Sequence, residues 1–167
     1  MKTLGIDCGT ECTGYGVVEL WPDGKLTCLT CGAIKLSPRD PLPIRLATIF
    51  DQLGVVIAAY RPDDVAIEDI FYALNVKSAL KLGQVRGVAM LAASSAGLAV
   101  AEYAPLVVKS AVVGYGRAEK PQVQHMVAQL LNLPENPEPP DAADALAIAI
   151  CHLHTSATLR RQPAAAR

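Results

Sequence analysis

The sequence predicts an α/β fold in which strands and helices follow the order βββαβαβα along the chain. Three β-rich segments separated by short turns come first, and two further β-rich segments each follow a stretch with helical periodicity. Strands that begin as a meander and later alternate with helices predict a five-stranded mixed sheet. The chain has 167 residues, of which 51% are hydrophobic, so we expect one domain with a well-filled core.

The first predicted strand contains Leu4 and Ile6 and ends at Asp7, after which Gly9 lets the chain turn. Residues 13–20 and 25–35 are predicted to complete an antiparallel meander, joined by a turn at 21–24. The later predicted elements are a helix at 44–60, a strand at 64–69, a helix at 75–96, a strand at 98–103, a short helix ending at Val113, a helix at 119–131 and a last helix that begins at Pro140.

We expect a single domain over residues 1–154 and a disordered tail over 155–167, where arginines are interspersed with alanines. No basic leader precedes an apolar segment and a cleavage site, and residues 88–101 come closest to a membrane span but are too short. These observations predict a soluble, cytoplasmic protein with no membrane partner.

The cysteines number five, and an odd count without a secretion signal does not suggest a disulfide framework. Cys8, Cys12, Cys28 and Cys31 could form a four-thiolate zinc site if all four sulfurs converged. Cys28 and Cys31 lie in a predicted strand, however, where an odd separation places side chains on opposite faces. We therefore favour small, buried hydrophobic roles for these cysteines.

Basic residues are concentrated in the middle of a chain whose net charge is only −1. Residues 75–120 contain two acidic side chains against six basic ones, namely Lys77, Lys81, Arg86, Lys109, Arg117 and Lys120. This pattern suits a polyanion that runs past a site whose own carboxylates need cations. An ordinary solvated helix face would show the same spacing.

Carboxylates recur at places where elements end or begin. Asp7 and Glu68 each end a predicted strand, and Asp141 and Asp144 lie on one face at the start of the last helix. Asp7 could instead bond turn amides, and Asp141 could cap the helix. If the three segments converge, oxygen-only ligands favour Mg²⁺ or Mn²⁺. Two such ions would support hydrolysis of a phosphodiester.

The chain also resembles the RuvC family of bacterial Holliday-junction resolvases, in the ribonuclease-H-like superfamily. The similar segments run in order to His154 and are Gly5-Ile6-Asp7-x-Gly9 with Thr13-Gly14-Tyr15-Gly16, Ala66-Ile67-Glu68 followed by Phe71, Ser78-Ala79-Leu80-Lys81-Leu82-Gly83-Gln84-x-Arg86-Gly87, Val112-Val113-Gly114-x-Gly116-x-Ala118-x-Lys120-x-Gln122-Val123, and Asp141-Ala142-Ala143-Asp144-Ala145.

The resemblance implies a sheet flanked by helices on both faces and a homodimeric, Mg²⁺-dependent endonuclease of recombination and repair. Such an enzyme nicks two opposed strands of a four-way DNA junction and works with a branch-migration complex of RuvA and RuvB. Mg²⁺ is expected as two ions per site, for which Mn²⁺ can substitute. The family's catalytic and metal-binding acids carry over onto Asp7, Glu68, Asp141 and Asp144.

The resemblance further assigns DNA contacts to Phe71, Asn75, Lys81, Arg86, Lys109 and Lys120. Phe71 would stack on a base near the crossover, whereas a core position is the alternative. Lys109 and Lys120 would lie near the scissile phosphate, or else on an ordinary solvated surface. The chain departs from many relatives at Cys8, where proline is common, and at Glu11 and Leu74, where a basic residue is common.

Other protein classes share parts of this pattern. Asp-x-Gly-Thr after a first strand also opens actin-like ATPases and sugar kinases, but those need a second lobe that this chain does not contain. A related nuclease that cuts RNA or RNA–DNA hybrids would have the same metal site. A junction-binding protein without activity predicts the loss of at least one carboxylate, and all four are present.

Overall fold

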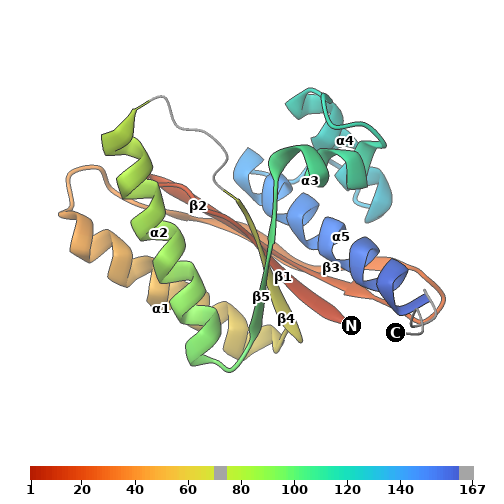
Figure 1. Ribbon diagram of the computed structural model, residues 1–167, viewed down its shortest axis with the longest axis horizontal. Helices are drawn as coiled ribbons and strands as arrows, with labels where there is room; N and C mark the ends of the chain where they lie inside the picture. The colour runs from red at the N-terminus through yellow and green to blue at the C-terminus, as the bar shows by residue number, and fades with distance from the viewer. Residues whose placement is uncertain (70–74, 162–167) are drawn as a thin grey trace, which may run out of the picture.

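The structure is a computed structural model that describes residues 1–69 and 75–161, with side chains of the last helix as far as residue 158. Figure 1 shows the elements along the chain. They are β1 (Lys2–Asp7), β2 (Cys12–Leu20), β3 (Leu26–Lys35), α1 (Leu42–Tyr60), β4 (Asp64–Glu68), α2 (Val76–Ser95), β5 (Ala99–Tyr103), α3 (Pro105–Val113), α4 (Lys120–Leu130) and α5 (Pro140–Arg161).

The five strands form one mixed sheet in the order β3-β2-β1-β4-β5, as the sequence predicts. β1, β2 and β3 pair antiparallel, whereas β4 pairs parallel with both β1 and β5. In the β1–β4 register Ile6 lies opposite Ile67, so Asp7 and Glu68, each the next residue in its strand, leave the sheet at the same edge. The topology therefore brings these two carboxylates together.

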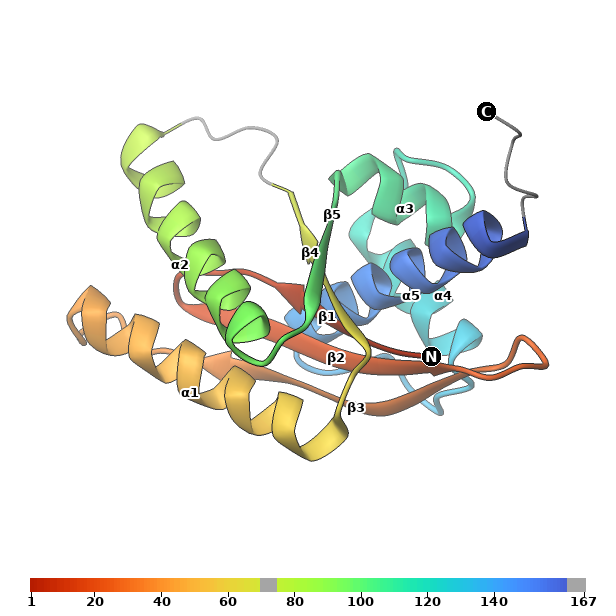
Figure 2. The same cartoon turned by 60° about the horizontal axis from the view of Figure 1, so that its bottom comes forward.

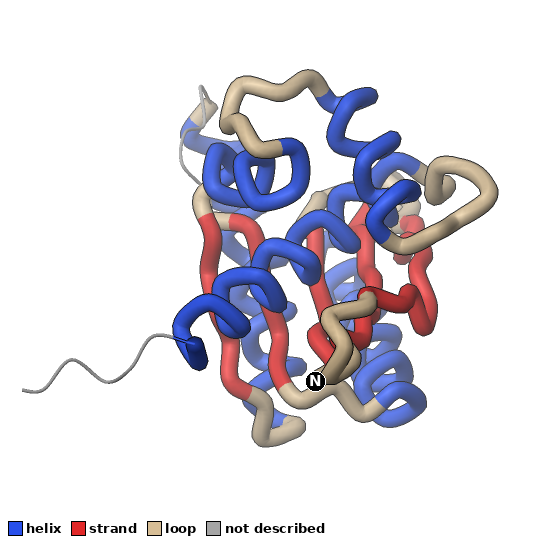
Figure 3. Tube along the Cα trace, turned by 90° about the vertical axis from the view of Figure 1, so that its right-hand side faces the viewer, coloured by secondary structure: helices blue, strands red, loops and turns tan. Residues whose placement is uncertain are grey.

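Helices cover both faces of the sheet, as Figures 1 and 3 show. α1 and α2 pack on one face over a core that includes Leu4, Ile49, Leu53, Val65 and Ile67, which we call the α1–α2 core. α5, with α3 and α4 outside it, packs on the other face over a core that includes Val18, Val108, Val127, Leu146 and Ile150, which we call the α5 core.

α5 lies unusually close to β1 and β2 because small residues face each other across the contact. A Cβ atom added at Gly5 would lie 2.0 Å from the Ala145 carbonyl oxygen, and one added at Gly14 would lie 2.0 Å from that of Asp141. Only glycine fits at these two positions without moving the helix. The glycines thereby fix the start of α5 over the ends of the strands.

α1 has the length and apolar composition of a membrane span, so residues 88–101 are not the nearest approach to one in this chain. The side chains of Ile49, Leu53, Val56 and Ile57 on α1 are buried against the sheet and α2. A helix that contributes one face to a protein core satisfies the same length and composition criteria.

The prediction that Cys28 and Cys31 lie on opposite faces was wrong. A bulge in β3 makes Cys28 the partner of Val18 and Thr30 the partner of Val17, which leaves Leu29 as an extra residue. The extra residue restores the alternation, so both thiols pack against the α5 core while Leu29 packs against the α1–α2 core. Cys8 also packs on the α1–α2 side, so the four thiols of the considered zinc site do not converge.

The last helix extends further than the predicted end of the domain at residue 154. α5 continues through Arg161, so residues 155–161 are helical rather than a disordered tail. The hydroxyls of Thr155 and Thr158 donate hydrogen bonds of 2.8 Å to the carbonyl oxygens of Cys151 and His154, one turn earlier. Residues 162–167 lie outside the described part of the chain.

Candidate active site

Three carboxylates from three elements line one pocket. Asp7 comes from the end of β1, Glu68 from the end of β4 and Asp144 from the first turns of α5. The pocket has a volume of about 200 Å³, and the residues that line it are Asp7, Glu68, Pro105, Val108, Lys109, Lys120, Val123, Asp144 and Ala147. The convergence expected from the strand ends and the last helix is therefore present for these three acids.

Asp141 lies beside this pocket rather than among the described residues that line it. Burial, together with a hydrogen bond donated to the Asp141 carboxylate, raises the pKa of the Cys12 thiol. The negative charge of Asp141 still acts on Asp7 and raises the pKa of that group. Asp141 is thus held by β2 one helical turn from Asp144, at the rim of the carboxylate cluster.

The carboxylates destabilise one another's charged forms. Burial, followed by the charges of Asp144, Glu68 and Asp141, raises the pKa of Asp7 to about 7. Burial and the charge of Asp144 also raise the pKa of Glu68. Acids kept close together and short of water in this way are typical of a functional site, because a cation or a proton must compensate them.

Two lysines supply the positive charge of the pocket. The Lys120 ammonium is 2.5 Å from an Asp144 carboxylate oxygen, and this hydrogen bond raises the pKa of Lys120. The Lys109 ammonium donates a 2.9 Å hydrogen bond to the Ala118 carbonyl oxygen. Both cations lower the pKa of Glu68, against the effects of burial and of Asp144.

Local structure fixes where the lysines lie. Lys109 is on α3, and its bond to Ala118 ties that helix to the segment that leads into α4. Lys120 is the first residue of α4, where Pro121 is preorganised for a helix start. The Glu119 amide donates a 2.9 Å hydrogen bond to the Gln122 side chain, which fixes the entry into α4.

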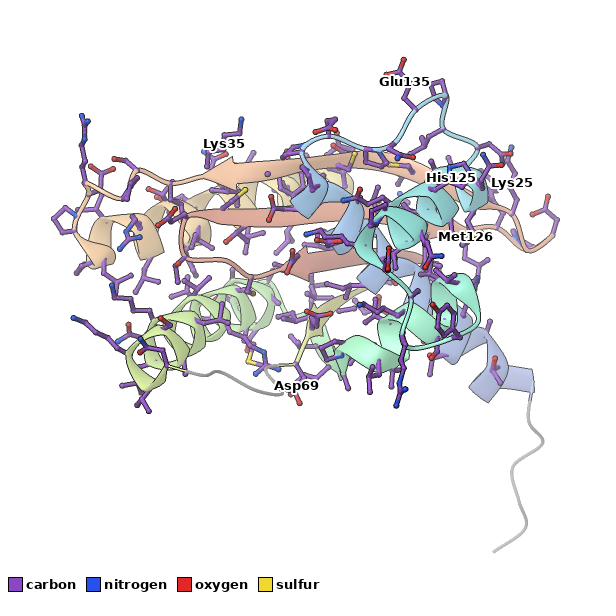
Figure 4. The ribbon with its side chains drawn as sticks, turned by 90° about the horizontal axis from the view of Figure 1, so that it is seen from above. Lys25, Lys35, Asp69, His125, Met126 and Glu135 are labelled. Atoms are coloured by element: carbon purple, nitrogen blue, oxygen red, sulfur yellow. The ribbon has the colours of Figure 1, made fainter. Side chains whose placement is uncertain are left out.

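Arg86 is bound within the protein, a role that the sequence did not reveal. Its Nε donates a 3.2 Å hydrogen bond to the Glu68 carbonyl oxygen, and its guanidinium pairs with Glu102 and, at 3.3 Å, with Asp69. Figure 4 shows Asp69 where the chain leaves β4, between α2 and α3. Arg86 therefore holds the end of β4, and with it the Glu68 backbone. Its partner Glu102 is in register with Ile67 only because β5 pairs with β4, so no local sequence signal indicated this role.

The remaining residues assigned to DNA are spread along α2 or precede it. The Asn75 side chain accepts hydrogen bonds from the Lys77 and Ser78 amides, so it caps the N-terminus of α2. Lys81 lies partly exposed on the same helix. Phe71 and Leu74 lie outside the described residues. The position of Phe71 relative to the pocket stays a prediction.

The donor set suits a divalent cation such as Mg²⁺, because carboxylate oxygens are the ligands that such ions prefer. The high pKa of Asp7 fits the same view, since a cation at the cluster would favour the charged form. Across residues 1–69 and 75–161, however, no three acidic, histidine or cysteine side chains are drawn together as tightly as metal ligands are. Asp144 is instead paired with Lys120.

Comparisons with known proteins agree over nearly the whole chain. The family model described as "Crossover junction endodeoxyribonuclease RuvC" matches residues 3–152. A protein of that name from Koribacter versatilis is 66% identical over 166 residues, covering 99% of this chain and 100% of the relative. Another from Acidobacterium capsulatum is 56% identical and covers 97% of this chain and 98% of the relative.

A solved structure gives the same result in three dimensions. Thermus thermophilus RuvC superposes with a TM-score of 0.87 at 37% identity, covering 95% of this chain and 96% of that one. The ribonuclease-H-like fold expected from the sequence is thereby confirmed. With a family model that spans the sheet, the carboxylate pocket and most of α5, this chain belongs to the RuvC family of crossover junction endodeoxyribonucleases.

Proposed function

We propose that this protein resolves four-way DNA junctions in recombination and repair by hydrolysing one phosphodiester in each of two opposed strands. The observation that carries the proposal is the pocket that joins Asp7, Glu68 and Asp144 with two lysines, in a member of the RuvC family. A T. thermophilus relative has been solved in complex with a Holliday junction substrate and superposes with a TM-score of 0.87 at 34% identity.

Asp7, Glu68 and Asp144, with Asp141 at the rim, would hold Mg²⁺, for which Mn²⁺ can substitute, and we propose two ions per site. When bound, such ions activate water and stabilise the charge on the phosphate and on the leaving oxygen. The charged form of Asp7 is disfavoured by burial and by its acidic neighbours, so binding a cation and losing a proton at this carboxylate are coupled.

The lysines are proposed to act on the nucleic acid. Lys109 and Lys120 bring two positive charges to a pocket that would otherwise repel a phosphodiester. Lys120 is half-exposed and pairs with Asp144, so a phosphate oxygen that entered the pocket could replace that carboxylate as its partner. Lys81, Asn75 and Phe71 are proposed to bind more distant parts of the junction.

Cutting two strands needs two sites, and α2 offers a surface on which two copies could pair. Val76, Leu80 and Leu91 on this helix are exposed by 75%, 66% and 56%. Gly83 and Gly87, between them along the helix, have open space where a Cβ would lie. Large apolar side chains beside flat glycine surfaces suit a helix–helix contact, so we propose a homodimer paired through α2.

A cytoplasmic location and cooperation with RuvA and RuvB are proposed from family membership.

The substrate preference separates this proposal from its alternatives. Purified protein would be incubated in Mg²⁺ with a synthetic four-way junction, a linear duplex of the same sequence and an RNA–DNA hybrid. We expect paired nicks in the junction and little cutting of the other two. Comparable cutting of all three would contradict the resolvase assignment and favour a general ribonuclease-H-like nuclease. Tight junction binding without cutting, with Mg²⁺ or Mn²⁺, would favour a non-catalytic binding protein.

A further inference from the structure

Two thiols lie side by side on β3, on the face that packs against α5. The bulge at Leu29 gives Cys28 the partner Val18 and Cys31 the partner Gly16 on β2. Because Gly16 and Val18 are two residues apart, the bulge shortens the separation of Cys28 and Cys31 from three residues of strand to about two. The two side chains therefore share a face although their spacing in the sequence is odd.

The separation is compatible with a covalent link. Two residues of strand rise by about 6.6 Å, which lies at the upper end of the roughly 4.4–6.8 Å between Cα atoms that a disulfide bridges. The thiols are also close enough for Cys28 to hydrogen-bond the Cys31 sulfur. Both side chains are partly exposed at the border of the α5 core. β3 is an edge strand, visible as such in Figure 2, so a small solute can reach them.

The hydrogen bond divides the roles of the two sulfurs. By donating to Cys31, Cys28 keeps its own proton and has a raised pKa, while the pKa of the Cys31 thiol is lowered. Burial raises the pKa of the other thiols, to about 12 at Cys8 and to about 11 at Cys12 and Cys151. Thiolate is the reactive form of cysteine, so chemistry should be selective for Cys31.

We propose that Cys28 and Cys31 form a redox-active dithiol that peroxides convert to an intrastrand disulfide. The Cys31 thiolate attacks one oxygen of hydrogen peroxide, the O–O bond breaks, and the departing hydroxide takes a proton to become water. The Cys28 sulfur then attacks the Cys31 sulfenic acid, losing its proton as the S–O bond breaks and a second water leaves. Two thiols are oxidised by two electrons in total, and one peroxide is reduced to two waters.

This site is separate from the carboxylate pocket, and the proposal does not rest on nuclease activity. Cys28 and Cys31 are not among the described residues that line the pocket. They are held by the β2–β3 pairing and by α5, so their proximity depends on the folded sheet. In the unfolded chain, oxidation should no longer favour Cys28 and Cys31, so the protein in denaturant is the reference for the test.

The test treats the folded, full-length protein with one equivalent of hydrogen peroxide at neutral pH, then alkylates remaining thiols in denaturant and maps peptides by mass spectrometry. We expect the peptide carrying Cys28 and Cys31 to lose the mass of two hydrogen atoms and to recover it with dithiothreitol. Cys8, Cys12 and Cys151 should stay alkylatable, reacting at least about tenfold more slowly. In Cys28→Ser, Cys31 should accumulate as a sulfenic acid that dimedone traps.

A matched double variant tests the geometry. Cys28→Ser with Leu29→Cys keeps two thiols in the segment but moves one to the α1–α2 side of the sheet, as the packing of Leu29 shows. We expect this variant to form no intrastrand disulfide in the folded state, confirmed as folded by circular dichroism. Equal disulfide formation in the double variant, faster oxidation of Cys8 or Cys12, or a Cys28–Cys31 link that appears only in denaturant would each overturn the proposal.

Discussion

β1 and β4 carry acidic residues at both ends of their parallel pairing, and the two ends are built in opposite ways. At the start, Asp64 accepts a 2.6 Å hydrogen bond from the Thr3 hydroxyl and lies 2.9 Å from the His152 ring. The Tyr103 hydroxyl bonds the other nitrogen of that ring at 2.8 Å. At the far end, Asp7 and Glu68 face each other and Asp144.

The same helix serves both ends. α5 contributes Asp144 to the carboxylate pocket and His152, eight residues and about 12 Å further along, to the network around Asp64. Each polar group of the Asp64 network has a protein partner, which stabilises the junction of β1, β4, β5 and α5. The carboxylate pocket instead groups like charges that a cation would compensate, beside two lysines that suit a phosphate. Burial of an acid alone thus does not identify the functional site; what identifies it is a group of buried acids that raise one another's pKa.

Among substitutions at the two ends, the largest effect is expected at Asp7, on the rate of junction cleavage. Asp7→Asn keeps the shape of the side chain but removes the charge that would hold a cation. We expect the rate of junction cleavage to fall by at least about 10³-fold, while junction binding changes by less than about threefold. Cleavage in single turnover and a gel-shift assay measure the two quantities. Full activity in this variant would contradict the assignment of Asp7 to the site.

Removing Asp64, the acid at the start of the β1–β4 pairing, should lower stability rather than activity. Asp64→Ala removes the acceptor of the Thr3 hydroxyl and the carboxylate partner of His152, so we expect a loss of about 3 kcal/mol in the free energy of unfolding. Urea denaturation measures it, and the cleavage rate of the folded fraction should stay within about threefold. Asp63→Ala is the control, since Asp63 is next in sequence and accepts an exposed bond from the Lys2 amide. A large loss of cleavage with normal stability would instead place Asp64 in the chemistry.

The sequence predicted the strand-end carboxylates because their placement follows from local rules. Leu4 and Ile6 mark a buried strand that ends at Asp7, and Glu68 ends another, so the two acids meet once β1 and β4 pair in parallel. The bulge at Leu29 depends on how β3 pairs with β2, which no local pattern in the segment announces. For that reason Cys28 and Cys31 were assigned to the wrong faces. Partners such as Glu102 for Arg86 likewise depend on which strands become neighbours.

The two ends of the β1–β4 pairing should also differ in how the loss of an acid changes stability at high pH. The folded-state pKa of Asp7 is about 7, above its ordinary value of 3.8, so the folded protein binds this proton more tightly than the unfolded chain does. The resulting stabilisation is fully present below about pH 4 and is lost as pH rises through 7. Without metal, Asp7→Asn should therefore be more stable than wild type at pH 8, by up to about 4 kcal/mol, and similar to it at pH 4.

Thermal or urea unfolding at the two pH values, with the metal removed by a chelator, tests this expectation. Added Mg²⁺ should stabilise the wild type at pH 8 and have a smaller effect on Asp7→Asn, because a ligand that binds only the folded protein stabilises it. Equal stability of wild type and Asp7→Asn at both pH values would show that the folded protein does not disfavour the charged form of Asp7. Asp64→Asn should give no such gain at pH 8, since its carboxylate already has partners.

The smallest expected effect concerns Arg86, which holds the backbone of Glu68 at the catalytic end. Arg86→Lys cannot reproduce both the bond to the Glu68 carbonyl oxygen and the pairing with Glu102. We expect cleavage to slow by about tenfold, or about 1.4 kcal/mol, with junction affinity unchanged. Lys81→Gln is the matched change on the same helix and should weaken binding alone. If Arg86→Lys also lowered affinity and its salt dependence, Arg86 would be a DNA contact rather than the support of β4.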